Sequence, residues 1–217
     1  MPDEIYKAGV LVLVRHGESL WNATHRWTGL TDIGLSPRGK KEADKIANLL
    51  TGFAFDAAFT SPLTRAKDTL GIVLKDLQLT HILIMIDPAL NERNYGIFTG
   101  KNKLDIKREV GEEHFFAIRR GWDIPIPEGE TLKDVYVRVV GYYKKIIAPL
   151  IKTGKNILVV AHGNSLRALM KYIEHISDSD IAYVELDTVE AVVYRINGNG
   201  TLESTTHLQI LSKSKHT

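Results

Sequence analysis

The chain has 217 residues, 44% of them apolar, which is enough to bury the core of one α/β domain. Its formal net charge of +2 is too small to indicate a nucleic-acid or membrane-surface partner, so an anion site would need local clustering of basic residues. The lack of cysteine excludes disulfides and cysteine-ligated metals, and no apolar run reaches the roughly 18 residues of a membrane span, so we expect a cytoplasmic protein.

The first third of the chain predicts two strands, each followed by a helix. Val10–Val14 is a continuous apolar run, typical of a strand that is buried on both faces. The next helix is expected to begin at a Ser-Pro pair, residues 36–37, and to end near Gly52. Phe55–Ser61 predicts the second strand, and another Ser-Pro pair, residues 61–62, is expected to begin the following helix.

The middle of the chain is less regular. Ile82–Ile86 predicts a third strand. Residues 90–130 then lose clear periodicity, with two short helices expected in KLDIKREVG and EEHFFAIRRG. We expect one domain over residues 1–217, in which residues 90–130 form an insertion that arches over the sheet and caps a ligand site.

The last third of the chain restores regular elements. A long helix is expected from Thr131 to near Gly154, and NILVVAHGNSLRAL predicts a strand, a glycine turn and a helix. Two β-rich stretches flank Asn-Gly-Asn-Gly at residues 197–200, which predicts a hairpin. The whole pattern predicts a three-layer α/β sandwich with a mostly parallel central sheet, helices on both faces and an antiparallel edge hairpin.

Two segments of the chain share one design. VLVLVRHGES and ILVVAHGNS each carry an apolar strand and then His-Gly, so His16 and His162 would lie at the carboxyl ends of parallel strands, where open sheets bind ligands. If these strands are neighbours, a spacing of roughly 5 Å brings the imidazoles face to face. The glycines would let backbone N–H groups approach a ligand. One such pair can simply end a strand, but two in matching contexts indicate a shared site.

Polar and basic residues gather near the first histidine. Arg15 precedes His16, Asn22 follows in the next loop, and Arg65 lies in the first turn of the helix after the second strand. Guanidinium groups suit phosphate oxygens because their donors lie in a fixed plane. An arginine in a first helical turn is usually a solvated charge that the helix dipole disfavours, and this misfit favours a functional role for Arg65.

The motifs together resemble those of a known family. RHGESLWN, SPLTRA, NERNYGIFTGKNK, RRG and AHGNSLRAL occur in this order and are similar to the cofactor-dependent phosphoglycerate mutases of the histidine phosphatase superfamily. The resemblance runs from about Val10 to Tyr172. It implies an isomerase of glycolysis and gluconeogenesis that interconverts 3-phosphoglycerate and 2-phosphoglycerate. The reaction would pass through a phosphohistidine primed by 2,3-bisphosphoglycerate, with no metal.

The resemblance also implies catalytic roles. His16 would be the nucleophile, with one ring nitrogen protonated and tethered, for instance to a backbone carbonyl, so that the other attacks. Arg15, Arg65 and His162 would surround the transferring phosphoryl group and stabilise its oxygens. Glu92 would act as general acid and base, although in isolation it would be a surface ion-pair partner of the arginine that follows it.

The implied substrate is a small phosphoglycerate with charge at both ends. The family uses the irregular segment to hold the substrate's carboxylate and second phosphate, and loop and turn residues to complete the phosphate cradle. The substrate-binding positions carried over in this way are Asn22, Thr28, Gly29, Arg93, Tyr95, Lys103, Arg119, Arg120, Gly163 and Asn164. The adjacent arginines at 119 and 120 could instead be a solvated charge run.

The superfamily also contains phosphatases with the same two histidines. Thr99 stands where many of these phosphatases carry an acid, and Lys103 adds a cation, so NERNYGIFTGKNK favours the mutase. Two departures favour hydrolysis: residues 121–130 are shorter than in many mutases, and only LSKSKHT follows the hairpin. A histidine-type phosphatase acting on small phosphate esters is therefore the alternative.

A third hypothesis is a non-catalytic phosphate-binding module. It predicts a missing nucleophile, whereas all five catalytic positions of the family are filled. Residues 185–193 lack the proline- and glycine-containing pattern of the family, and the sequence assigns them no role.

Overall fold

The computed structural model describes residues 8–79 and 81–210, and within them six strands form one sheet in the order β3-β2-β4-β1-β5-β6. The strands are β1 (Gly9–Arg15), β2 (Ala57–Thr60), β3 (Leu83–Ile86), β4 (Asn156–Ala161), β5 (Glu190–Ile196) and β6 (Leu202–Gln209). The four strands from β3 to β1 are parallel, whereas β5 runs antiparallel to both of its neighbours. The prediction of a mostly parallel sheet with an antiparallel edge hairpin is confirmed.

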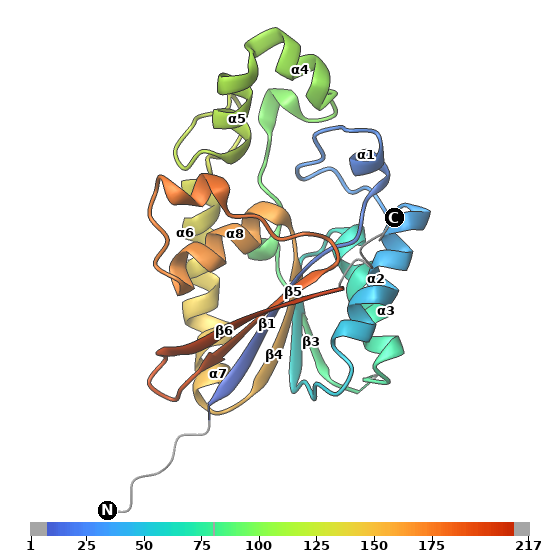
Figure 1. The fold of residues 1–217 in the computed structure, drawn as a ribbon, viewed down its shortest axis with the longest axis vertical. Coiled ribbons are helices and arrows are strands. Elements are labelled where there is room, and N and C mark those ends of the chain that lie inside the picture. Colours follow the sequence, from blue (N-terminus) through green and yellow to red (C-terminus); the bar gives the residue numbers. More distant parts are fainter. Residues whose placement is uncertain (1–7, 80, 211–217) are drawn as a thin grey trace, which may run out of the picture.

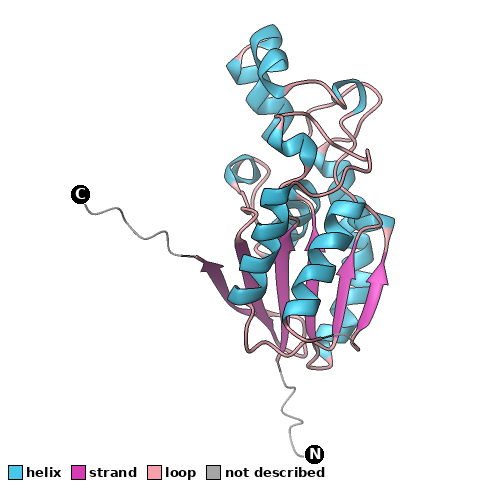
Figure 2. Cartoon of the chain, turned by 90° about the vertical axis from the view of Figure 1, so that its right-hand side faces the viewer, coloured by secondary structure: helices cyan, strands magenta, loops and turns pink. Residues whose placement is uncertain are grey.

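Helices cover both faces of the sheet, which completes the predicted three layers (Figures 1 and 2). One layer contains α2 (Pro37–Leu49) and α3 (Thr64–Asp76). The other contains α6 (Leu132–Tyr142), a π-helical turn (Tyr143–Ile147), α7 (Ala148–Lys152) and α8 (Gly163–Ile173). Beyond the carboxyl ends of the strands lie α1 (Leu20–Ala23), α4 (Lys103–Val110) and α5 (Glu112–Arg120).

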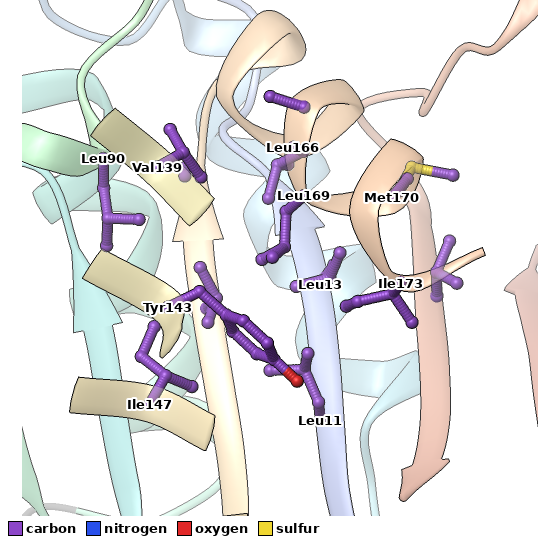
Figure 3. Packing of buried hydrophobic residues seen from close by; sticks show 14 of the residues in the cluster. Leu11, Leu13, Leu90, Val139, Tyr143, Ile147, Leu166, Leu169, Met170 and Ile173 are labelled. Carbon is purple, nitrogen blue, oxygen red and sulfur yellow. The ribbon is translucent and has the colours of Figure 1, made fainter. Parts of the chain in front are cut away.

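Alternate residues of the central strands enter opposite layers. Leu11 and Leu13 of β1 pack with residues of α6 and α8, as Figure 3 shows. Val12 and Val14 pack with residues of α2 and α3. All four side chains are buried, and because neighbouring side chains point to opposite faces of a strand, only an unbroken apolar run satisfies both layers.

The beginnings of two helices differ in how well the sequence predicted them. At α2, the hydroxyl of Ser36 accepts the Gly39 N–H as expected of an N-cap, and the helix ends three residues before Gly52. In contrast, α3 begins at Thr64, later than its Ser-Pro pair predicted, and it has no side-chain cap. The hydroxyl of Ser61 instead lies 2.7 Å from a ring nitrogen of His162.

Other predicted elements hold with small changes in their ends. The two short helices expected in the irregular segment are α4 and α5, and β2 and β3 are shorter than predicted. The long helix after Thr131 contains a π-helical turn that the sequence did not predict. No helix within residues 8–79 and 81–210 is long and apolar enough to cross a membrane. The tail LSKSKHT, residues 211–217, lies outside the described residues.

The loop after β1 packs directly on the first turn of α2. A Cβ at Gly17 would lie 2.2 Å from the carbonyl oxygen of Gly39, and a Cβ at Gly39 would lie 2.0 Å from the carbonyl oxygen of Glu18. The Gly17 N–H is already donated to Thr69 Oγ1, at 3.1 Å. Gly17 is therefore required by helix packing, and the expectation that it frees an N–H for a ligand is wrong.

Candidate active site

The two histidines meet at the carboxyl ends of adjacent strands. Arg15 of β1 is in register with Ala161 of β4, so the next residues, His16 and His162, lie side by side. Their ring centroids are 4.9 Å apart, with an interplanar angle of 63°. Both side chains are buried. The prediction that the two imidazoles meet is confirmed, but they meet edge to face rather than face to face.

His16 is held with one nitrogen tethered and the other directed to a cation. Nδ1 lies 2.7 Å from the carbonyl oxygen of Gly17, a contact that requires a proton on Nδ1. Nε2 accepts a hydrogen bond from Arg65 Nε, at 3.3 Å. Burial, followed by the charges of Arg65 and Arg15, lowers the pKa of His16 well below its usual value. The imidazole is therefore neutral near neutral pH, with its lone pair on Nε2.

Two arginines flank this imidazole. The guanidinium of Arg65 is fully buried and donates to the carbonyl oxygens of Gly29, at 2.8 Å, and Thr31, at 3.0 Å. Arg15 donates from Nη1 to the carbonyl oxygen of Leu186, at 3.2 Å. These backbone contacts fix both planes before any ligand arrives, which is the preorganisation that electrostatic catalysis requires.

Glu92 is held by the amino end of α8. Its Oε1 accepts hydrogen bonds from the side-chain amide of Asn164, at 3.0 Å, and from the backbone N–H groups of Arg93 and Asn164, at 2.7 and 3.2 Å. The same amide of Asn164 also donates to the hydroxyl of Tyr95, at 2.7 Å. Glu92 forms no ion pair with the Arg93 guanidinium, so the simpler interpretation of this residue is wrong.

Arg93 is fully buried but lies away from the cavity. Its guanidinium donates to the backbone carbonyl oxygens of Glu130, Ile118 and Ile124. The structure does not place it with the other predicted substrate-binding residues. It holds α5 and the loop after α5 against the segment that carries Glu92.

One cavity collects the remaining predicted residues. From the predicted set it is lined by Arg15, His16, Asn22, Thr28, Gly29, Arg65, Glu92, Tyr95, Lys103, Arg119, Arg120, Gly163 and Asn164. Four further residues line it that the sequence did not predict: Trp27, Arg167, Glu185 and Leu186. His162 does not line the cavity; it is fully buried, and its ring packs against the ring of His16.

Arg167 is a functional candidate that sequence reasoning missed. It is buried on α8, one turn after Asn164, whose side-chain oxygen it contacts at 2.9 Å. It also donates to the carbonyl oxygen of Arg120, at 2.7 Å. Burial, followed by the charge of Arg120, lowers the pKa of Arg167 to about 10. Its spacing of three residues from Asn164 was the available signal.

Glu185 lies in the segment 185–193, to which the sequence assigned no role, and the structure places it at the site. Its carboxylate lies 3.4 Å from Nη1 of Arg120 and 3.9 Å from Nη1 of Arg15, so it partly balances both arginines. The neighbouring Leu186 supplies the carbonyl that orients Arg15. Both residues line the cavity. Only the tertiary fold reveals this, because they belong to no local motif.

Lys103 adds a cation whose charge is sensitive to pH. Burial, followed by the charges of Arg119 and Arg15, lowers the pKa of Lys103 to about 8. Its ammonium lies 5.8 Å from the centre of the Trp27 ring.

The donor set fits a phosphate ester. Five buried polar atoms around the site have no hydrogen-bond partner among the described residues: Arg15 Nε, Trp27 Nε1, Thr28 Oγ1, His162 Nδ1 and Arg167 Nε. Buried polar groups normally find partners, so these atoms indicate a site built for a ligand rich in acceptor oxygens. Residues 8–79 and 81–210 contain no group of three or more His, Asp or Glu side chains placed to hold a metal ion.

Comparisons with known proteins agree with this geometry. Residues 11–206 match the family model of the histidine phosphatase superfamily, branch 1. The chain is 44% identical over 201 residues to a 2,3-bisphosphoglycerate-dependent phosphoglycerate mutase of Afipia carboxidovorans, covering 92% of this chain and 97% of the relative. It is 45% identical to the protein of the same name from Nitrobacter winogradskyi, covering 90% and 95%.

Two solved structures share the fold of this chain. A putative alpha-ribazole-5'-P phosphatase from Escherichia coli superposes with a TM-score of 0.76 at 28% identity, covering 94% of this chain and 97% of that one. YhfR from Bacillus stearothermophilus gives a TM-score of 0.79 at 26% identity, covering 90% and 95%. With its two facing histidines, its cationic cavity and a family match over most of its length, the chain belongs to branch 1 of the histidine phosphatase superfamily.

Proposed function

We propose that this chain interconverts 3-phosphoglycerate and 2-phosphoglycerate through a phosphohistidine at His16, primed by 2,3-bisphosphoglycerate. The observation that supports this proposal most is the neutral, tethered imidazole of His16 in a cavity that cations of α4 and α5 also line. The names of curated relatives at 43–45% identity support the mutase over other reactions of the superfamily.

The nucleophilic step uses the two nitrogens of His16 differently. When bound, the bisphosphate supplies a phosphoryl group, and the lone pair of Nε2 forms the new bond to phosphorus. The ring then gains positive charge, which the Gly17 carbonyl stabilises through the hydrogen bond from Nδ1. Arg15 and Arg65 offset the negative charge on the phosphoryl oxygens.

Glu92 moves the proton that accompanies each transfer. It gives a proton to the substrate oxygen that leaves phosphorus, and it takes one from the hydroxyl that attacks the phosphohistidine in the return step. The donors at the amino end of α8, including Asn164, fix one of its oxygens, which leaves the other available for this exchange.

The far end of the substrate would contact the cations of the insertion. Lys103, Arg119 and Arg120 come from α4 and α5 and line the same cavity as His16. A monophosphate must turn round between its two transfers, so both ends of the cavity need to accept an anion. We infer that residues 90–130 cap the site within one domain and limit the access of water to the phosphohistidine.

Hydrolysis is the second candidate. Its support is the similarity to the Escherichia coli protein that bears a phosphatase name, together with the short segment 121–130. In this reaction, water attacks the phosphohistidine and Glu92 takes its proton. The same residues serve both reactions, so the fate of the phosphoryl group decides between them.

The test is phosphorylation of His16 combined with a coupled isomerase assay. We expect 2,3-bisphosphoglycerate to add one phosphate to His16, and isomerisation to depend on that compound with little phosphate released. His16→Ala should abolish both signals, whereas His114→Ala, an exposed position on α5, should change neither. Phosphate release without isomerisation would identify the chain as a phosphatase. Full activity in His16→Ala would refute both the mutase and the phosphatase proposals.

A further inference from the structure

Three neighbouring strands end at the catalytic centre, but the proposed mechanism uses residues from only two of them. In the sheet, β2 lies next to β4 and β4 lies next to β1. His16 follows β1 and His162 follows β4, as described above. The residue that follows β2 is Ser61. Thr60 of β2 is in register with Val160 of β4, so Ser61 and His162 both lie just beyond the ends of neighbouring strands. Ser61 is therefore brought to the side of His162 by the sheet itself.

The contact between Ser61 and His162 is short and shielded from solvent. Ser61 Oγ lies 2.7 Å from Nε2 of His162, and both side chains are fully buried. Neither Ser61 nor His162 lines the cavity, but the ring of His162 packs against the ring of His16, which does. Of these two imidazoles, Ser61 contacts that of His162.

The hydrogen bonds of Ser61 favour one direction for this contact. Oγ accepts the backbone N–H of Leu63, at 3.3 Å, and carries one proton of its own. That proton is free to point at Nε2, which then acts as the acceptor. A neutral imidazole has one protonated nitrogen, so the proton of His162 lies on Nδ1. Burial, followed by the charge of Arg65, lowers the pKa of His162 and keeps the ring neutral.

The other nitrogen of His162 has no partner. Nδ1 is buried and forms no hydrogen bond with any described residue. An unpaired N–H costs free energy in the empty site, and a phosphoryl oxygen on the adjacent His16 ring would satisfy it. In the opposite tautomer, Nδ1 would present a lone pair beside an anion, which is repulsive. The identity of the protonated nitrogen therefore decides whether His162 stabilises or repels the phosphoryl group.

We propose that Ser61 is a positioning residue that fixes His162 as its Nδ1–H tautomer, so that this N–H is the donor offered to the phosphoryl group on His16. The inference rests on the proposed phosphohistidine chemistry. With Ser61, residues at the ends of three strands take part in the site. Ser61 sets the tautomer of His162, and His162 donates a hydrogen bond to the phosphoryl group on His16. Orienting a catalytic imidazole through its second nitrogen is a recurrent way of selecting one tautomer.

The first measurement is the tautomeric state of His162 by 15N NMR of histidine-labelled protein. We expect wild type to show a protonated Nδ1 and Ser61→Ala to show a mixture of the two tautomers. The matched control is Thr60→Val, which removes the adjacent buried hydroxyl bonded to the carbonyl oxygen of Val160, at 2.8 Å, but does not touch His162. It should retain the wild-type signal. A wild-type ring protonated on Nε2 would overturn the proposal.

The second measurement is the rate of His16 phosphorylation by 2,3-bisphosphoglycerate. For this reaction, Ser61→Ala should lower kcat by about 10- to 100-fold, which is less than the loss expected when a direct transition-state donor is removed. The KM for 2,3-bisphosphoglycerate should stay within about twofold of wild type. Thr60→Val should stay within about twofold in both constants. A Ser61→Ala variant that keeps a protonated Nδ1 and the wild-type kcat would show that Ser61 is merely structural. A wild type that forms no phosphohistidine refutes the proposed function instead, while the NMR result still decides the role of Ser61.

Discussion

Two fully buried arginines of this chain, Arg65 and Arg93, perform different tasks. Both donate to backbone carbonyl oxygens, but only Arg65 also reaches the ring of His16. Each lies within a motif of the family, and both were predicted from these motifs to contact a ligand. The roles of the two arginines differ because the tertiary fold brings different backbone carbonyls near each guanidinium. These carbonyls belong to residues that are distant in sequence, so the local motif does not reveal them. The histidines were better predicted, because strand ends in a parallel sheet share one edge.

At the same scale, Lys103 should make substrate binding depend on pH. With a pKa of about 8 in the empty cavity, its ammonium is charged at lower pH and neutral at higher pH. Affinity for an anionic substrate should therefore fall as the pH rises from about 7 to about 9, up to roughly tenfold, because the charged form favours the anion. The measurement is KM or Kd across this range. Binding near pH 8 should also take up protons, which calorimetry in buffers of different ionisation enthalpy detects.

The control for this pH dependence is Lys103→Met, which keeps the apolar stem and removes the charge. Its affinity should be low and nearly constant over the same range. An identical pH profile in Lys103→Met and wild type would assign the titration to another group.

At the scale of elements, helix and strand positions followed from the pattern, but contacts between elements did not. The Ser-Pro pair at residues 36–37 begins α2 as predicted, whereas the same pair at residues 61–62 lies before α3. At the second pair, Ser61 Oγ accepts the N–H of Leu63, one residue before the helix begins, and also contacts His162, which is far away in sequence. A local cap signal therefore does not fix where a helix begins when the serine also has a buried tertiary partner.

The contact between α2 and the loop after β1 gives an element-scale prediction. Gly39→Ala should lower the free energy of unfolding by about 1–3 kcal/mol, because the new Cβ would lie 2.0 Å from the carbonyl oxygen of Glu18. Chemical denaturation measures this change. Phosphorylation of His16 should slow as well, since the displaced loop carries the carbonyl of Gly17 that tethers the ring.

A helical glycine elsewhere provides the matched control. Gly71 lies within α3, and a Cβ there would meet nothing within 4 Å. Gly71→Ala should raise the free energy of unfolding by about 0.5–1 kcal/mol, because alanine loses less backbone entropy in a helix. Equal effects at the two glycines would contradict the packing argument.

At the scale of the whole molecule, the three layers and the clustering of site residues were predictable, because both depend on buried strands and on their shared edge. The contributions of Arg167, Glu185 and Ser61 were not. Glu185 belongs to a segment without a motif, and Arg167 and Ser61 lie in recognised motifs at positions to which no role was given. Each acquires its place through the packing of parts that are distant in sequence.

The exposed edge of the sheet leads to a prediction about association. Strand β3 is an edge strand, and its side chains Leu83, Ile84 and Ile86 are 60%, 47% and 53% exposed. An apolar edge with unpaired backbone groups is a template for another strand. We expect the protein to self-associate through β3, and Ile84→Lys should shift it toward the monomer in sedimentation velocity.

The control for association is Leu104→Lys, which places the same charge on an exposed leucine of α4, away from any strand edge. This variant should sediment like wild type. If both variants behave alike, association through β3 is refuted.

The order of strands in the sheet also has a consequence for synthesis on the ribosome. Strand β1 ends at Arg15, whereas its partners β4 and β5 begin only at Asn156 and Glu190, so they are synthesised much later than β1. At typical elongation rates, the strand that bears the nucleophile waits on the order of ten seconds for its neighbours. A nascent chain that lacks β4 and His162 cannot assemble the paired histidines, so chemical competence should arise in one event after His162 has been made rather than grow with chain length.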